Sequence, residues 1–516
     1  MIQRVASAIL QHRFPCVVQG AVTISVLLAW GVAAVEVAAQ GSDTAALRSA
    51  ENLQRQLNQE DAEMRQAYYA NAPISERLSI EYGGTFRYAF NIIDTAQSQE
   101  TYQQIYDLRL FTSIELDGAH RFFGRLRFQY NQWDFRGTRA IGPDYDDVGW
   151  QNPIGEIYWY EFNLAGMIRA QTGNKPDYNF VAKVGRQYVI WGQGAALSNY
   201  MYAGIFDFSW RDWKATALIG VTSGNDTIDW DLSRPGYDTD TQRLFYGGKL
   251  EYSGFAGHRP YVYLLAQKDL NEGQVALLPA ALPTIPTTFN YDSSYVGLGS
   301  NGSLGAGLVY RAECMYEYGT TLSDPLPRDG TLTPVPQQNV TISAVAGLGG
   351  LTWLGRDPAD SRIDFQIVAG SGSSDRLDSG NTFGGIAPGA VDTSFNSLGY
   401  VNTGLVLSPD FANLLCPSVG FSTSPFPGGG IFHNLRLGVT GFLFGRILSN
   451  APLSFQTQPG GTNYVGGEVD FSLEWRLLSD LDLSFKYGIF MPNQAAFAPS
   501  QSGTRDFVYI GGTYAF

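Results

Sequence analysis

The chain has 516 residues and a net charge of −14; only 16% of its residues are charged, whereas 14% are aromatic and 59 are glycine. A soluble protein of this size usually has about a quarter of its residues charged, and the negative net charge argues against binding of nucleic acid. Beyond the N-terminus, no apolar run approaches the ~20 residues that a membrane-spanning helix needs. The composition therefore favours a transmembrane β-barrel, in which lipid-facing and lumen-facing residues alternate.

The N-terminal part predicts export from the cytoplasm. Residues 1–39 resemble a secretory signal peptide, because two arginines flank the start of a long apolar stretch and Val37 and Ala39 offer small residues for cleavage. A retained membrane anchor is the alternative. Residues 40–76 are predicted to be a periplasmic leader with a short amphipathic helix over residues 44–70, or else a loosely ordered leader.

From residue 77 onward, apolar and polar residues alternate with a period of two, which indicates β-strands. The strands are longer than those of a soluble β-sandwich, and short connections alternate with long polar ones. Residues 77–516 are therefore predicted to form an all-β, transmembrane antiparallel β-barrel of about 18 strands. The alternative is 16 strands, because residues 398–430 supply either a strand and a turn or a segment folded into the lumen.

The last eight residues, YIGGTYAF (509–516), continue the strand pattern to the C-terminus. A barrel in lipid must pair its last strand with its first, since an open edge leaves backbone groups unsatisfied. The pattern resembles the C-terminal assembly signal of outer-membrane barrels. It predicts a location in the bacterial outer membrane, with membrane lipid and the barrel-assembly machinery as partners.

The polar parity of the strands predicts the side chains that line the lumen. Guanidinium groups bind carboxylates through two parallel hydrogen bonds, and Arg109, Arg125 and Arg127 on adjacent strands are expected to form a cluster. The alternative is that the lumen charges only pair with one another across strands. The predicted substrate-binding residues are Arg87, Arg109, Arg125, Arg127, Lys183, Arg243, Lys249, Arg311, Arg362, Arg436, Glu468, Asp470 and Lys486.

Four segments resemble the alginate-export family: IYDLRLFTSIELDGAHRFFGRLRFQY (105–130), VAKVGRQYVIWGQG (181–194), FDFSWRDWKATALIGV (206–221) and GGEVDFSLEWRLLSDLDLSFKYGIFMP (466–492). The resemblance implies an outer-membrane barrel that exports an anionic polysaccharide through an arginine-lined lumen. It also implies periplasmic secretion components as candidate partners.

Catalysis finds no support in the sequence, because the four histidines are scattered and no nucleophile or phosphate-binding motif is present. The chain is not expected to be an enzyme or to carry a cofactor. Five aspartates of one long loop offer oxygen ligands for Ca²⁺, but solvated extracellular acid is the favoured interpretation. Two further functions are alternatives to the exporter: a general diffusion porin, and a structural barrel that anchors a periplasmic partner. The five aspartates are Asp226, Asp229, Asp231, Asp238 and Asp240.

Overall fold

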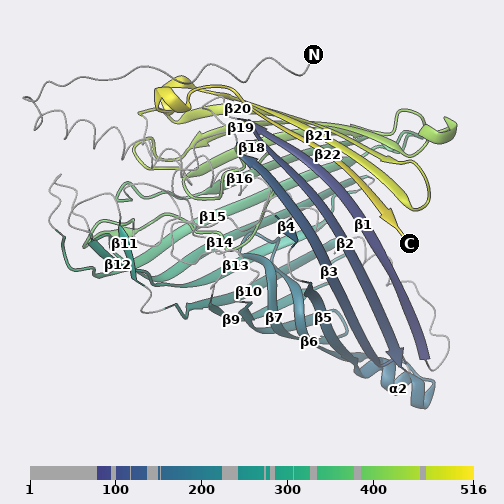
Figure 1. The fold of residues 1–516 in the computed structure, drawn as a ribbon. Helices are drawn as coiled ribbons and strands as arrows, with labels where there is room; N and C mark the ends of the chain where they lie inside the picture. The colour runs from purple at the N-terminus through teal and green to yellow at the C-terminus, as the bar shows by residue number, and fades with distance from the viewer. Residues whose placement is uncertain are drawn as a thin grey trace, which may run out of the picture.

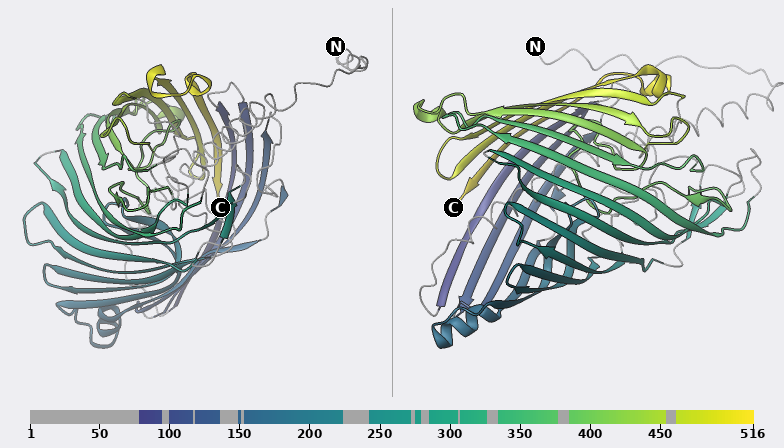
Figure 2. Two further views of the ribbon diagram at one scale, coloured as in Figure 1. Left: turned by 90° about the vertical axis from the view of Figure 1, so that its left-hand side faces the viewer. Right: turned by 180° about the vertical axis from the view of Figure 1, so that it is seen from behind.

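The protein is a closed antiparallel β-barrel, seen from the side in Figure 1 and along its axis in the left view of Figure 2. The predicted signal peptide and leader, and the acidic loop proposed for Ca²⁺, lie outside the residues that this computed structural model describes. The described residues are 78–94, 100–116, 118–135, 149–150, 153–223, 242–271, 275–278, 285–305, 307–325, 334–376, 385–453 and 461–516.

Eighteen strands of the described residues form the barrel wall, each antiparallel to the next, so the prediction of 18 strands is confirmed. The last strand pairs with the first over Thr85–Ile93 and Phe507–Ala515, as the C-terminal pattern predicted. The wall strands are β1 (Leu78–Asp94), β2 (Glu100–Leu116), β3 (His120–Phe135), β5 (Ile154–Asn163), β6 (Tyr178–Trp191), β7 (Leu197–Trp210), β8 (Trp213–Thr222), β9 (Arg243–Tyr252), β10 (His258–Asp269), β13 (Tyr291–Ser303), β14 (Leu308–Leu322), β15 (Asn339–Leu354), β16 (Arg362–Gly370), β18 (Leu414–Thr423), β19 (Leu435–Arg446), β20 (Tyr464–Arg476), β21 (Leu481–Pro492) and β22 (Arg505–Ala515).

The remaining elements lie in the connections between wall strands. One short connection contains helix α2 (Leu164–Thr172), which begins after the N-cap Asn163 and ends at Gly173 in the left-handed conformation, φ 74°. No helix in the described part of the chain is long and apolar enough to cross a membrane. The other elements are β4 (Gly149–Trp150), the separate hairpin β11 (Val275–Leu278) and β12 (Ile285–Thr288), β17 (Val391–Asp392), and the 3₁₀ turns η1 (Gly430–Phe432), η2 (Gln494–Ala496) and η3 (Pro499–Gln501).

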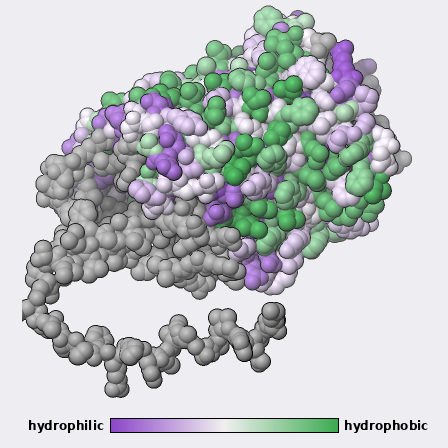
Figure 3. Space-filling view, turned by 90° about the horizontal axis from the view of Figure 1, so that it is seen from above, coloured by the Kyte–Doolittle hydropathy of each residue, from purple (hydrophilic) through white to green (hydrophobic). Residues whose placement is uncertain are grey.

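The outer face of the wall is apolar. Ile219, Leu264 and Leu298 on β8, β10 and β13 point outward and are each more than half exposed, at 56%, 57% and 64%. Figure 3 shows such apolar residues, in green, over much of one outer face. The neighbouring residues Phe245 and Leu265 have the opposite parity and are buried inside the barrel. This sidedness follows from the two-residue repeat of a strand and is typical of a lipid-facing surface.

The two ends of the barrel differ in their connections. At one end, the short-turn end, adjacent strands are joined by few residues, and aromatic side chains stand on the outer face: Trp210, Trp213, Tyr252, Trp353 and Trp475 are examples. At the other end, the long-loop end, connections are long, as between β16 and β18. Both described chain ends, residue 78 and Phe516, lie at the short-turn end, where Phe516 exchanges two backbone hydrogen bonds with Gly84 of 2.9 and 3.0 Å.

The main hydrophobic core lies inside the barrel, towards the long-loop end. It joins inward residues of the wall, such as Phe444 and Phe490, to Phe395, Leu398 and Phe411 of the β16–β18 connection. The left view of Figure 2 shows this connection folded within the ring of strands. The two alternatives for residues 398–430 therefore both apply in part, because residues 398–413 fold into the lumen and β18 then completes the wall.

The VGRQ motif (residues 184–187) lies where the pairing of β5 with β6 ends, before the tip of the β6–β7 hairpin. The β5–β6 ladder runs from Asn163 with Val181 only as far as Tyr158 with Arg186. Gly185 has φ 141°, and a Cβ there would lie 2.3 Å from the carbonyl oxygen of Tyr158, so only glycine fits. Arg186 Nε then donates to the carbonyl of Glu156 over 2.9 Å, which satisfies a β5 acceptor beyond the end of this ladder.

Candidate functional site: the lumen of the barrel

The first candidate site is an arginine cluster on β2 and β3. Arg109 and Arg127 are direct partners in the β2–β3 register, as the tight turn between these strands predicted. Two carboxylates lie among the guanidinium groups. Arg109 Nη2 is 3.1 Å from Asp107 Oδ2 and 3.2 Å from Glu156 Oε1, Arg125 Nε is 2.6 Å from Glu156 Oε2, and Arg127 Nε is 3.2 Å from Asp107 Oδ1.

These ion pairs change the expected character of the cluster. Within the described part of the chain, these ion pairs place three guanidinium groups against two carboxylates, so this group of five side chains carries one more positive than negative charge. The side chains of Arg109 and Arg125 are only 5% and 4% exposed, whereas Arg127 is 14% exposed. Arg125 Nη2 also donates to the hydroxyl of Tyr200, over 3.3 Å. Arg127 is therefore the member of the cluster best placed to meet a solute.

Carboxylates of the wall hold the inward part of the β16–β18 connection, residues 393–413, which we call the lumen segment. Glu468 accepts hydrogen bonds from the backbone N–H groups of Val406 and Leu407, at 2.8 and 2.9 Å, and Asp470 accepts one from Leu405, at 3.1 Å. Both acids are on β20 and were predicted to bind substrate. In the structure they are buried and hold three consecutive amides of the chain itself.

On β14, two further glutamates hold inward segments. Glu317 accepts from the backbone N–H of Asn396 at 2.8 Å and from the Tyr291 hydroxyl at 2.6 Å. Glu313 accepts from the backbone N–H of Gln193, at the tip of the β6–β7 hairpin, at 2.7 Å. The lumen segment is thus attached to the wall at two separate strands, β14 and β20.

The hairpin tip and the lumen segment also bind each other. The Ser397 hydroxyl donates to the carbonyl of Ala195 over 2.6 Å, and Tyr400 N–H donates to Gly194 over 3.0 Å. Together these two segments fill part of the lumen with fixed backbone. The free cross-section available to a solute is correspondingly smaller than the wall alone would leave.

The second candidate site is a recess of about 350 Å³ on the inner face of β14, β15, β16, β18 and β19. It lies nearer the short-turn end than the lumen segment does, and Asn402 of the lumen segment forms part of its lining. Arg362 binds Asp364 through two contacts of 2.6 and 2.7 Å, and Arg311 donates to Gln366 over 2.6 Å. Its remaining polar lining includes Thr352, Ser418 and Thr440, with Phe442 beside them.

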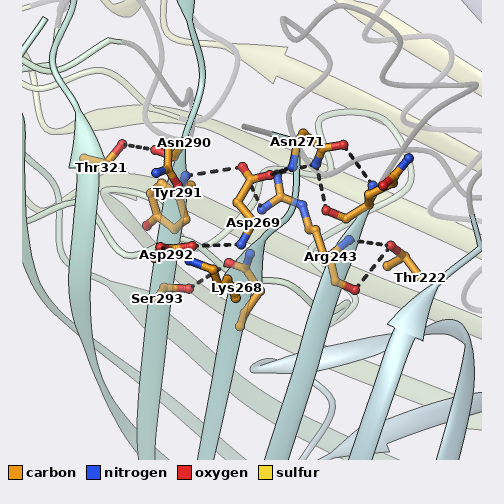
Figure 4. A network of polar contacts seen from close by, with 12 residues as sticks. Thr222, Arg243, Lys268, Asp269, Asn271, Asn290, Tyr291, Asp292, Ser293 and Thr321 are labelled. Atoms are coloured by element: carbon orange, nitrogen blue, oxygen red, sulfur yellow. Dashed lines mark hydrogen bonds and ion pairs between the residues drawn. The ribbon is translucent and has the colours of Figure 1, made fainter. Parts of the chain in front are cut away.

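A third cluster of polar residues lies at the long-loop end of the wall (Figure 4). Arg243, the first residue of β9, is fully buried, with Nη1 3.7 Å from Asp269 Oδ2. Asp269 also accepts from the backbone N–H of Asn271 and of Tyr291, at 2.9 and 3.3 Å. Arg243 was predicted to bind substrate, but its complete burial and its buried partner indicate a structural role at the rim.

The other predicted residues are dispersed over the wall rather than gathered with these groups. Arg87 lies opposite Asp107 in the β1–β2 register. Lys183 stands 4.1 Å from the centre of the Trp159 ring, and Lys249 stands 5.9 Å from that of Trp191. Two further residues complete the set: Arg436, which donates to the Ser422 hydroxyl over 2.9 Å, and the buried Lys486, which pairs with Ser472 in the β20–β21 register.

No protein-family model matches the chain, and no curated protein matches it either. Solved structures match its fold. The chain is similar to Acinetobacter baumannii OccAB1, with 9% identity and a TM-score of 0.51 over 85% of this chain and 96% of that one. It is also similar to Pseudomonas aeruginosa OccK8 (OprE), with 12% identity and a TM-score of 0.50 over 85% of this chain and 98% of that one.

The expected relationship to the alginate-export family is wrong. No family model matches, and the two solved structures named above are Occ proteins, neither of which is described as an alginate exporter. Two of the motifs that suggested the relationship have structural roles in this barrel. Gly185 and Arg186 of VGRQ end the β5–β6 ladder, and Glu468 and Asp470 of the β20 motif hold the lumen segment.

Residues of the lumen that the sequence prediction missed fall into two groups. Glu156 joins the arginine cluster, but a register shift between β3 and β5 at Arg125 and Leu126 disturbs the simple parity that would have placed it. Gln366 and Asn402 line the recess through a hydrogen bond of 2.8 Å between the wall and the lumen segment. No local sequence pattern predicts the hydrogen bond between Gln366 and Asn402, because it depends on the path of a long connection.

Proposed function

We propose that the chain is a porin-type channel of the bacterial outer membrane that lets small water-soluble solutes cross. The apolar outer face and the closed hydrogen-bonded wall suit a barrel that lies in lipid. The inner face carries charges, as in a channel that passes polar solutes. Both features are needed for such a function, and both follow from the same two-residue alternation.

One observation carries the choice of small solutes over a polymer. The lumen segment and the tip of the β6–β7 hairpin occupy the interior and are fixed to the wall at Glu468, Glu317 and Glu313. A polymer would have to pass this fixed backbone along its whole length. A small solute needs only a local gap beside it.

The excess positive charge at Arg109, Arg125 and Arg127 supports a preference for anions among those solutes. A ring or cluster of like charge selects ions by sign. Arg127 is the most exposed of the three and lies next to a single carboxylate at 3.2 Å. A carboxylated solute would therefore meet a guanidinium group at this level of the lumen.

The test is reconstitution of the full barrel in planar bilayers and in liposomes. We expect ion-conducting channels with a reversal potential that shows anion preference, and liposome swelling that falls off as the solute grows from a monosaccharide to an oligosaccharide. Size-independent passage of long oligouronates would contradict the proposal. An absence of current would favour a structural barrel instead.

A further inference from the structure

The recess on β14–β19 owes its volume to glycines that line it. A Cβ on Gly420 would lie 3.0 Å from Thr440 Oγ1, and a Cβ on Gly350 would lie 2.9 Å from Cγ of Arg311. Any larger residue at these inward positions would project into the recess or displace its lining. The space of about 350 Å³ falls in the range of small-molecule sites.

Each charged side chain of this recess already has a partner within the chain: Arg362 and Asp364 pair with each other, and Arg311 donates to the Gln366 amide oxygen. Arg362 holds Asp364 in a two-contact ion pair, and Asp364 Oδ1 also accepts from the Thr352 hydroxyl over 2.6 Å. An arginine that grips a carboxylate of its own chain offers fewer donors in the fork geometry that an incoming carboxylate would need. The donors that this recess offers to a solute are therefore mainly amide and hydroxyl groups, because the guanidinium groups of Arg311 and Arg362 are already engaged.

The remaining polar lining offers both hydrogen-bond donors and hydrogen-bond acceptors. Gln366 accepts from Arg311 over 2.6 Å and donates to the Asn402 carbonyl over 2.8 Å, which fixes the orientation of its amide. Ser418 and Thr440 add hydroxyl groups, each of which both donates and accepts. Phe442 supplies an apolar surface beside them.

From this arrangement we infer that the recess binds a neutral polyhydroxylated solute of about the size of a monosaccharide or disaccharide. Vicinal hydroxyls both donate and accept, so they match a lining of paired ions, amides and hydroxyls. The C–H face of a sugar ring matches the Phe442 side chain. The inference rests on the proposed function only in that a solute must reach the recess through the lumen.

Binding is measured on the purified full chain in detergent, by equilibrium dialysis with radiolabelled D-glucose, maltose and D-glucuronate. Glucose and glucuronate share a ring and differ in charge. We expect saturable binding of glucose or maltose that is about tenfold tighter than binding of glucuronate, a difference of about 1.4 kcal/mol in binding free energy. Tighter binding of glucuronate, or no saturable binding of either neutral sugar, would overturn the inference.

Two variants make the test specific. Gly420→Val fills the recess and should abolish the binding of glucose. The control, Gly441→Val, places the same side chain on the outer face of the adjacent strand, where a Cβ meets no atom within 4 Å, and should leave the binding of glucose unchanged. If Gly420→Val fails to fold, as judged by heat-modifiable mobility, Thr440→Val removes a lining hydroxyl at nearly constant volume. Sugar binding that survives the variant used is evidence against the recess.

Asp364→Asn should change the relative affinities of the recess for glucuronate and glucose. The variant releases Arg362 from its ion pair, so glucuronate should gain and glucose should lose affinity. An unchanged order of the two ligands would contradict the role given to this pair. Because dialysis needs no current, neutral sugar binding without conduction would overturn the proposed channel alone, and conduction without sugar binding would overturn this inference alone.

Discussion

Glu468→Ala should loosen the lumen segment and change the conductance of the channel without unfolding the barrel. Glu468 is 1% exposed, and its two oxygens accept the N–H groups of Val406 and Leu407 at 2.8 and 2.9 Å. Alanine leaves both amides without this acceptor in a buried place. The backbone ladders of β20 with β19 and β21 do not involve the side chain, so the wall should still close.

The size of the effect follows from the two lost hydrogen bonds. A buried donor left without its acceptor costs about 1–3 kcal/mol, so the attached state of the segment should lose roughly 2–6 kcal/mol. Even the lower limit corresponds to about a 30-fold shift toward the detached state. Glu468→Gln keeps one carbonyl oxygen as an acceptor and should cost about half as much.

The assay combines single-channel recording with limited proteolysis. We expect larger and noisier conductance in Glu468→Ala, with a new chymotryptic cut at Tyr400, and a smaller change in Glu468→Gln. The matched control is Glu474→Ala, on the same strand but exposed and near the short-turn end. Quiet channels of normal conductance and a protected Tyr400 in Glu468→Ala would refute the view that this carboxylate holds the segment.

Four other changes test separate parts of the structure. Arg127→Glu should lower anion preference, read as a shifted reversal potential, and an unshifted value would argue against the arginine cluster as a filter. Glu156→Gln should raise anion preference and lower the unfolding temperature, because it leaves the buried guanidinium groups without this negatively charged partner. A more stable variant would contradict a stabilising role for these buried ion pairs. Deletion of Phe516, or its replacement by a charged residue, should impair insertion, and normal heat-modifiable mobility would argue against the closing strand. Gly185→Val should prevent folding or lower the unfolding temperature, since its Cβ would meet the Tyr158 carbonyl oxygen at 2.3 Å. A fully stable variant would show that the close approach of Gly185 to Tyr158 is not required.

The wall of the barrel could be predicted from the sequence because it depends on local alternation. Inward and outward positions of a strand differ by one residue, so Arg109, Arg125 and Arg127 were placed together by parity and by the length of one turn. The closing of β1 with β22 was also predictable, since a barrel in lipid leaves no free edge.

The contents of the lumen could not be predicted in the same way. Phe395 and Phe411 lie in a connection without strand or helix periodicity, and their burial depends on long-range contacts. Glu468 and Asp470 share the polar parity of β20 with exposed lumen residues, yet their partners are amides about 60 positions away. Parity indicates that a side chain points inward, but it does not tell whether water, a solute or the chain itself will meet it.

The pairing of β1 with β22 has a consequence for biosynthesis. This ladder joins the two ends of the barrel sequence, so its loop-closure entropy is among the largest that the chain must overcome, and contacts of this kind slow folding. The ring cannot close while the chain is still being synthesised, because the C-terminal partner strand arrives last. Until then the strands expose unpaired edges and apolar faces that aggregate readily. Closure of the barrel must therefore wait until the last strand is available, and the earlier strands remain open at one edge until then.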